Sequence, residues 1–62
     1  MKKKYYVVTF YNGRTVFAYA FNSSEAITLS QAVMIKNGFT YDVESMRETR
    51  YESDKQLTDF YA

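Results

Sequence analysis

The chain has 62 residues and a formal net charge of +1, from eight basic and seven acidic residues, and it lacks both cysteine and histidine. This length leaves room for a single domain, residues 1–62, with one small core. Without cysteine there is no disulfide or thiolate–metal site, and without histidine the usual general base and the commonest metal ligand are absent. The sequence therefore predicts a protein that is not an enzyme and that holds no metal or cofactor.

Aromatic residues make up 19% of the chain, and tyrosine, with seven copies, is common on binding surfaces. The near-balance of charge argues against a protein whose main role is to coat phosphate backbones. The N-terminal residues MKKKYYVV are not followed by an uninterrupted apolar segment, and no apolar run is long enough to span a bilayer. Together with the missing cysteine, this favours the cytoplasm and no contact with a membrane.

The first element is a predicted β-hairpin, because Asn12-Gly13 stands between two runs rich in β-branched and aromatic residues. A two-residue type I′ turn would pair Tyr11 with Arg14. One face of the hairpin would then carry Tyr5, Val7, Thr9, Tyr11, Arg14, Val16, Ala18 and Ala20. The other face would carry Tyr6, Val8, Phe10, Thr15, Phe17, Tyr19 and Phe21.

A helix is predicted next, over residues 24–36. Asn22-Ser23-Ser24-Glu25 is typical of a helix start, and Asn37-Gly38 is typical of a helix end. The predicted core stripe of this helix is Ala26, Leu29 and Val33, with Ile27, Ser30 and Met34 at its margin.

Residues 39–50 resume the alternation of a strand, and a right-handed crossover would place this strand beside the first one, in the order 2-1-3. In the tail, Ser53 and Gln56 have the spacing of a capping box, which favours a short final helix. The predicted fold is therefore α+β: a ββαβ two-layer sandwich with a three-stranded antiparallel sheet, one helix packed on one face and a short C-terminal helix.

One helix of this length covers one face of such a sheet, so the second face needs another cover. We assign the helix to the hairpin face with Val7, Val16, Ala18 and Ala20, because these small residues let a helix approach closely. The residues expected to make dimer or sheet-face contacts on the open side are Tyr6, Phe10, Phe17, Tyr19 and Phe21. Two covers are considered: a homodimer that buries the open face or the helix flanks, or the tail folding back through Leu57, Phe60 and Tyr61.

These surfaces favour a protein-binding module, which needs an aromatic, apolar anchor set and a polar rim. The alternative is a small nucleic-acid-binding protein, because exposed rings on a sheet form a stacking platform for single strands. Asp42, Glu44 and Glu48 weigh against that alternative, since they bring negative charge to the third strand. The sequence does not predict a catalytic role, because it shows no glycine-rich phosphate loop and no metal-ligand spacing, and a domain of this size has no deep cleft.

In the order of its elements, the chain resembles the family of small phage proteins that inhibit uracil-DNA glycosylase. The resemblance covers residues 5–51: the hairpin YYVVTFYNGRTVFAYAF, the helix NSSEAITLSQAVMIKNG and the strand FTYDVESMRE. It implies a dimeric DNA mimic. In that family the dimer forms a hydrophobic pocket that captures the apolar finger that the enzyme pushes into DNA, and acidic residues around the pocket take the place of phosphates.

The resemblance implies partner-binding residues at matching positions of this chain. Ile27, Gln31, Met34 and Ile35 occupy the stretch of the pocket-lining helix. Asp42, Glu44 and Glu48 would supply the acidic rim. The resulting expectation is a phage-encoded, non-enzymatic homodimer that binds a host protein in the cytoplasm and inhibits a DNA-processing enzyme, with uracil-DNA glycosylase as the candidate target.

Overall fold

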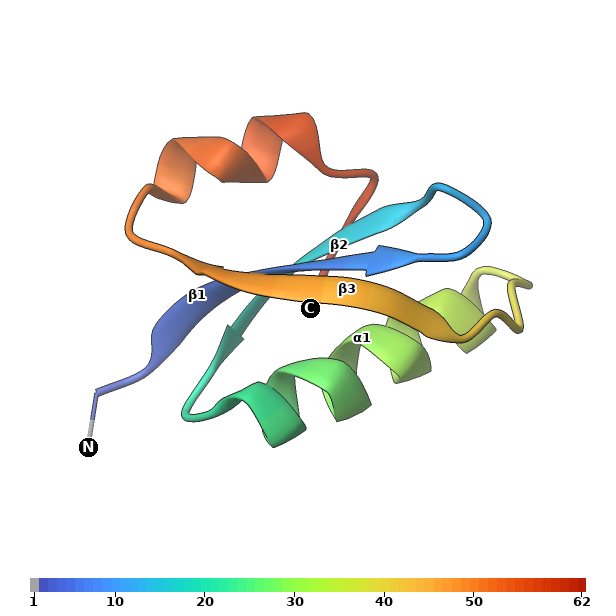
Figure 1. Cartoon of the computed structure of the whole chain (residues 1–62), viewed down its shortest axis with the longest axis horizontal. Helices are drawn as coiled ribbons and strands as arrows, with labels where there is room; N and C mark the ends of the chain where they lie inside the picture. The colour runs from blue at the N-terminus through green and yellow to red at the C-terminus, as the bar shows by residue number, and fades with distance from the viewer. Residues whose placement is uncertain (1) are drawn as a thin grey trace.

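The computed structural model describes residues 2–62, which fold into an α+β sandwich. A four-stranded mixed sheet separates two helices, so that α1 lies along one face and the 3₁₀ helix η1 lies over the other (Figure 1). In chain order the elements are β1 (Lys4–Phe10), β2 (Thr15–Ala20), α1 (Ser23–Lys36), β3 (Val43–Thr49), η1 (Glu52–Leu57) and β4 (Phe60–Tyr61). Within residues 2–62, no helix has the length and apolar character needed to cross a membrane.

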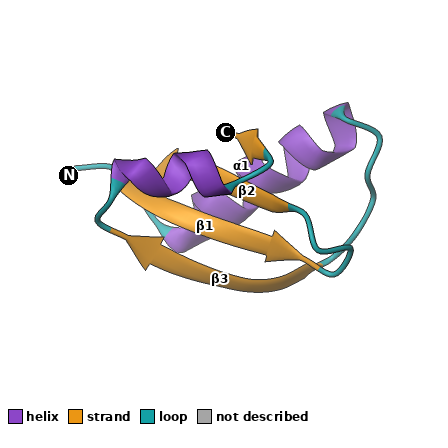
Figure 2. Cartoon of the chain, turned by 90° about the horizontal axis from the view of Figure 1, so that it is seen from above, coloured by secondary structure: helices purple, strands orange, loops and turns teal. Residues whose placement is uncertain are grey.

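The strands lie in the order β3-β1-β2-β4, with β1 between β3 and β2 (Figure 2). The first three strands are antiparallel and have the predicted 2-1-3 order. The prediction of three strands is wrong, because β4 adds a fourth strand parallel to β2. Ala62 N donates to Phe17 O at 2.8 Å and Tyr19 N donates to Ala62 O at 3.2 Å, so even this two-residue strand extends the sheet.

The hairpin between β1 and β2 turns through three loop residues, Tyr11, Asn12 and Gly13, instead of the predicted two. Gly13 N donates to Phe10 O at 2.9 Å, and Phe10 N donates to Arg14 O at 2.9 Å. Gly13 has a φ of 84°, the left-handed conformation that closes a three-residue loop built on a type I turn. The extra loop residue shifts the register of the two strands by one position from the prediction.

This shift changes which side chains share a face, because strand side chains alternate between the two faces of a sheet. Tyr5 lies opposite Tyr19 instead of Ala20. The face beneath α1 therefore combines bulky β1 residues with smaller β2 residues: Tyr6, Val8, Phe10, Val16, Ala18 and Ala20.

The predicted sheet-face contact residues do not form one surface, so that part of the prediction is wrong. Tyr6 and Phe10 are buried in the core beneath α1, where they cannot contact a partner. Phe17 is also buried, with 5% of its surface exposed. Tyr19 and Phe21 are the members of the set that remain exposed.

Helix α1 begins within one residue of its predicted start, and the side chain of its N-cap, Asn22, accepts a hydrogen bond from Glu25 N at 2.8 Å. It buries a different stripe from the predicted one. The buried residues follow one line at a spacing of four: Ala26, Ser30 and Met34. Leu29, which was expected in the core, is exposed. The small Ala26 packs on Ala18 and Ala20, and this close contact sets the face that the helix turns to the sheet.

Strand β3 begins four residues later than predicted, and residues 39–42 form a connection to it. The register between β3 and β1 shifts at Phe10, which leaves Glu44 as the extra residue of a β-bulge. A bulge interrupts the alternation of side chains. Asp42 also precedes the strand, so the three residues expected to supply the acidic rim, Asp42, Glu44 and Glu48, do not follow one regular strand face.

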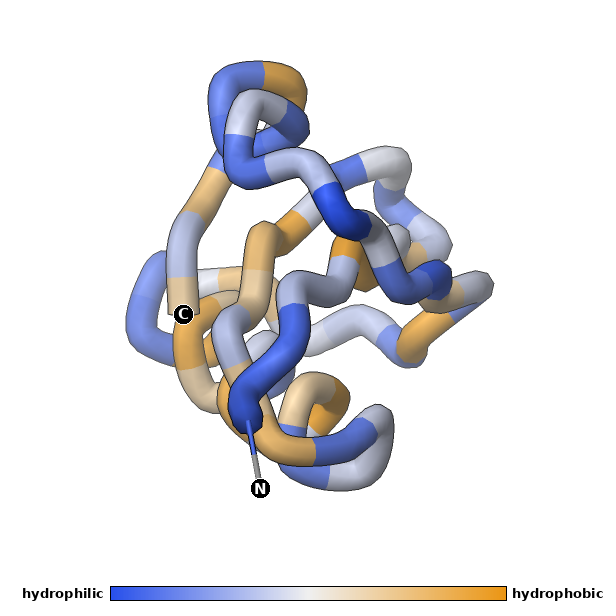
Figure 3. The backbone as a smooth tube through the Cα atoms, turned by 90° about the vertical axis from the view of Figure 1, so that its left-hand side faces the viewer, coloured by the Kyte–Doolittle hydropathy of each residue, from blue (hydrophilic) through white to orange (hydrophobic). Residues whose placement is uncertain are grey.

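The C-terminal segment covers the second face of the sheet, which is one of the two covers considered. On that face Val7 and Phe17 are buried, and η1 lies over it (Figure 1). Of the residues expected to cover this face, Leu57, Phe60 and Tyr61, not all contribute to the cover. Leu57, the last residue of η1, is 77% exposed, whereas Phe60 packs against the core cluster beneath α1. The tube that runs over η1 is mostly hydrophilic (Figure 3).

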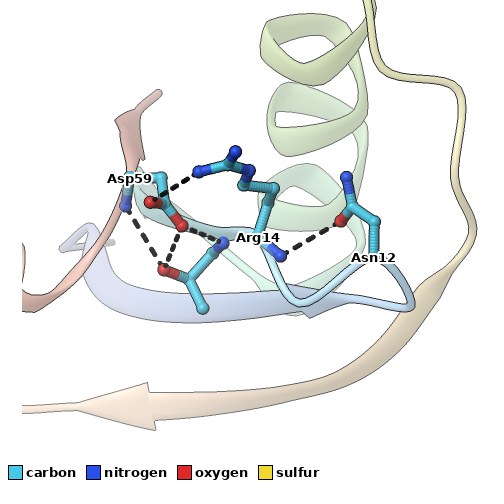
Figure 4. A network of polar contacts seen from close by, with 4 residues as sticks. Asn12, Arg14 and Asp59 are labelled. Carbon is cyan, nitrogen blue, oxygen red and sulfur yellow. Dashed lines mark hydrogen bonds and ion pairs between the residues drawn. The ribbon is translucent and has the colours of Figure 1, made fainter.

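Two aspartates fasten this segment to the sheet. Asp54 Oδ2 accepts a hydrogen bond from Thr49 Oγ1 at 2.6 Å and lies 3.3 Å from Arg47 Nη1. Asp59 Oδ2 accepts a hydrogen bond from Thr15 N at 2.9 Å (Figure 4). The first contact holds the start of η1 against β3, and the second holds the start of β4 against β2.

Candidate functional site

A surface pocket of about 320 Å³ lies between the C-terminal half of α1 and the connection to β3. We name it the α1 pocket. Its lining residues are Gln31, Met34, Ile35, Phe39, Thr40, Tyr41 and Asp42. The first three belong to α1, and the other four are residues 39–42 of the connection between α1 and β3.

The connection is held at both of its ends, so the pocket is part of the folded structure. At the helix end, Gly38 has a φ of 88° and reverses the chain, and Phe39 N donates to Met34 O at 2.9 Å. At the strand end, Tyr11 N donates to Asp42 O at 3.1 Å and ties the connection to the hairpin loop.

The α1 pocket combines one buried apolar side chain with exposed apolar and polar groups. Met34 is buried, and its flexible thioether adapts easily to different shapes. Ile35 is 63% exposed, and Tyr41 is also exposed beside it in the lining. Gln31 contributes an amide and Asp42 a carboxylate. Apolar contact surface with a few polar groups around it is the arrangement of an anchor pocket in protein interfaces.

The fold brings together four of the seven predicted partner-binding residues: Gln31, Met34, Ile35 and Asp42. Ile27 is half-buried and lies about 12 Å before Ile35 along the helix axis, outside the pocket. Glu44 sits at the β-bulge, and Glu48 Oε1 lies 3.3 Å from Lys4 Nζ. Of the predicted acidic rim, only Asp42 lines the pocket.

Sequence reasoning misses three of the lining residues, namely Phe39, Thr40 and Tyr41. Their apolar and polar side chains alternate, and this alternation predicts the beginning of a strand. The residue that indicates a connection is Gly38. A glycine at the end of a helix reverses the chain, and the residues that follow it need not begin a strand at once.

The carboxylates with lowered pKa values lie outside the α1 pocket, in structural contacts. The hydroxyl of Thr49 lowers the pKa of Asp54, and the backbone N–H of Thr15 lowers the pKa of Asp59. In the part of the chain that the structure describes, no three potential metal ligands come together. What the α1 pocket offers chemically is shape, apolar contact and one carboxylate.

Comparisons with protein-family models, with curated proteins and with solved structures give no match for this chain.

Proposed function

We propose that the chain is a non-catalytic protein-binding module whose α1 pocket receives an apolar side chain of the partner. The observation that supports this is the convergence of Met34, Ile35 and Asp42 on one pocket. The exposed isoleucine beside a buried methionine provides an apolar anchor contact, and the carboxylate provides part of a polar rim. A volume of about 320 Å³ lies at the small end of the range for ligand sites, which suits one side chain better than a large cofactor.

The proposed partner is a host DNA-processing enzyme, and uracil-DNA glycosylase is the candidate target. This part rests on the resemblance of residues 5–51 to the phage inhibitor family. On this proposal the chain is phage-encoded, the α1 pocket captures the apolar finger of the enzyme, and Asp42 stands in for a phosphate of DNA. Inhibition is then competitive, because the enzyme cannot hold DNA and this protein at the same time.

A homodimer belongs to the same proposal, at the helix flank, which is one of the two surfaces expected for it. Because the C-terminal segment covers the sheet, the apolar flank of α1 around the exposed Ile35 is the surface that a second copy would use. Ile35 also lines the α1 pocket, so a second copy on this flank would border the pocket, as the dimer-formed pocket of the resembled family implies.

Replacing Ile35 with glutamate tests this proposal. Because Ile35 is 63% exposed, Ile35→Glu should change the free energy of unfolding by no more than about 0.5 kcal/mol. A carboxylate at the anchor position should weaken partner binding by about tenfold or more. The measurements are inhibition of purified uracil-DNA glycosylase, and retention of bacterial proteins from a nuclease-treated lysate on the immobilised wild type and variant.

Leu57→Glu is the matched control, since Leu57 is 77% exposed on η1 and lies outside the α1 pocket. We expect it to bind and inhibit as the wild type does. Equal binding by both variants, or a collapse of the circular-dichroism melt in Ile35→Glu, would contradict the assignment of the pocket. Sedimentation at high concentration examines the dimer, which Ile35→Glu should dissociate. A monomeric wild type would remove the dimer from the proposal.

A further inference from the structure

A second hollow, of about 250 Å³, lies on the η1 side of the sheet, opposite α1. Its lining residues are Tyr5, Phe17, Tyr19, Glu52, Lys55, Tyr61 and Ala62. The Tyr5 ring is central: its centroid lies 4.9 Å from that of Tyr19, in a stacked arrangement, and 5.2 Å from that of Phe17. Tyr61 lies beside Phe17, because β4 pairs with β2 at these residues. We name these four rings, with Phe21, the aromatic strip.

Lysines stand at both ends of the aromatic strip. Lys3 Nζ lies 5.4 Å from the ring centroid of Tyr19 and 5.3 Å from that of Phe21. Lys55 Nζ lies 4.6 Å from the ring centroid of Tyr61. Tyr61 pairs with Phe17, which lies roughly 7 Å along the chain from Tyr19 and roughly 13 Å from Phe21, from a rise of about 3.3 Å per residue.

The ammonium groups at the strip have no carboxylate partner among residues 2–62, since the ion pairs there use Lys4, Arg14 and Arg47. Glu52 is the one acidic residue of the hollow. Glu52 and Tyr5 line the same hollow, and the Glu52 carboxylate, with burial as a smaller cause, raises the pKa of Tyr5. Two cations and one anion leave the aromatic strip with a net positive charge.

We infer that the aromatic strip binds single-stranded nucleic acid, with bases stacked on the exposed rings of Tyr19 and Tyr61. On binding, Lys3 and Lys55, which lie over these rings in the free protein, turn from the rings to the phosphates of the strand. Base–aromatic stacking combined with lysines along the strand is the physical basis of sequence-tolerant single-strand binding. The hollow is too small for a large folded ligand but has room for a base, and the two lysines are far enough apart to meet different phosphates of one strand.

Other ligand classes fit this surface less well. A ligand cation would find aromatic faces, but Lys3 and Lys55 already lie over three of them and would repel it. Duplex DNA keeps its base faces stacked inside the helix, so it could use the lysines but not the rings. A single strand satisfies both the charge and the aromatic surface.

Fluorescence anisotropy of a labelled oligothymidylate of about a dozen nucleotides, at low salt, tests this inference directly. Tyr19→Ala should weaken binding by about tenfold, because it removes an exposed stacking surface. Lys55→Gln should weaken binding and reduce the slope of log K against log salt by about 0.7, the value for one phosphate contact on a single strand. Glu52→Gln should tighten binding, because it removes the negative charge beside the strip.

Tyr11→Ala and Lys36→Gln are the matched controls, since both residues are exposed and lie away from the aromatic strip. We expect their affinities to stay within about twofold of the wild type. The inference is overturned if the oligonucleotide does not bind at low salt, or if Tyr19→Ala and Lys55→Gln behave as the controls do. Equal affinity for duplex DNA, or equal competition by thymidine monophosphate, would likewise exclude a single-strand site. If Tyr19→Ala fails to fold, the two charge variants still test the inference, because Lys55→Gln should weaken binding and Glu52→Gln should tighten it.

Discussion

At the scale of single residues, Ser30 is a polar group in an unfavourable place. Its side chain is fully buried on the sheet-facing line of α1, and its hydroxyl has no hydrogen-bond partner within residues 2–62. A buried hydroxyl without a partner costs free energy, and alanine is also the better helix former. We expect Ser30→Ala to raise the free energy of unfolding, measured by urea titration, by about 1 kcal/mol.

A larger residue at the same position, Ser30→Leu, should lower the free energy of unfolding. Because no part of Ser30 is exposed, a leucine must displace its neighbours, and overpacking of this kind costs about 1–3 kcal/mol. A lower stability in both variants would mean that the hydroxyl is satisfied in the folded protein.

Asp59 is a second residue whose contacts lead to a measurable effect, the dependence of stability on pH. Its carboxylate accepts from Thr15 N at 2.9 Å and lies 3.4 Å from Arg14 Nη1 (Figure 4). The Thr15 N–H is the main cause that lowers the pKa of Asp59 below its ordinary value of 3.8. A depressed folded pKa means that the ionised group stabilises the fold above the unfolded pKa. This stabilisation is lost as the pH falls through the lower pKa of the folded state.

We therefore expect the free energy of unfolding to fall between about pH 5 and about pH 2, and Asp59→Asn to flatten part of this decline. At neutral pH the same variant should be less stable by about 1 kcal/mol, because a partly exposed hydrogen-bonded contact is lost. Urea titrations at several pH values measure both effects. Glu44→Gln, which removes an exposed carboxylate that forms no ion pair within residues 2–62, should keep the wild-type slope. An unchanged slope in Asp59→Asn would contradict this account.

At the scale of elements, the C-terminal segment is held by Phe60 and not by Leu57. Phe60 is half-buried, packs against the cluster beneath α1, and has its ring centroid 6.0 Å from that of Phe39. We expect Phe60→Ala to lower the free energy of unfolding by about 2 kcal/mol, less than a fully buried phenylalanine would cost. Leu57→Ala should change it by less than about 0.5 kcal/mol. Similar losses in the two variants, measured by urea titration, would show that η1 packs more tightly than this structure has it.

At the scale of the whole molecule, the two candidate surfaces lie on opposite sides of the sheet. The α1 pocket is built from α1 and residues 39–42, and the aromatic strip is built from β1, β2 and β4 beneath η1. They share no lining residue. Substitutions at one surface should therefore leave binding at the other unchanged, since distant sites without shared partners act independently.

By itself, the sequence determined the elements that depend on local chemistry. The Asn-Gly turn signal, the capping sequence from Asn22 to Glu25 and the helix end at Gly38 are satisfied by neighbours a few residues away, so the hairpin and α1 were predictable. The α+β class and the order of the first three strands followed from these elements. Four residues of the α1 pocket, Gln31, Met34, Ile35 and Asp42, were named in advance because the resemblance to the inhibitor family implied them.

Only the tertiary structure decided the register, the strand β4 and the composition of the two surfaces. Asn-Gly is compatible with loops of two or three residues, and one extra residue exchanges the faces of a strand, which moved Phe10 from the predicted surface into the core. The bulge at Glu44 separated the predicted acidic rim in the same way. The pairing of β4 with β2 depends on contacts between residues more than 40 positions apart, such as Asp59 with Thr15. No local pattern encodes such contacts, because their stability comes from the assembled sheet.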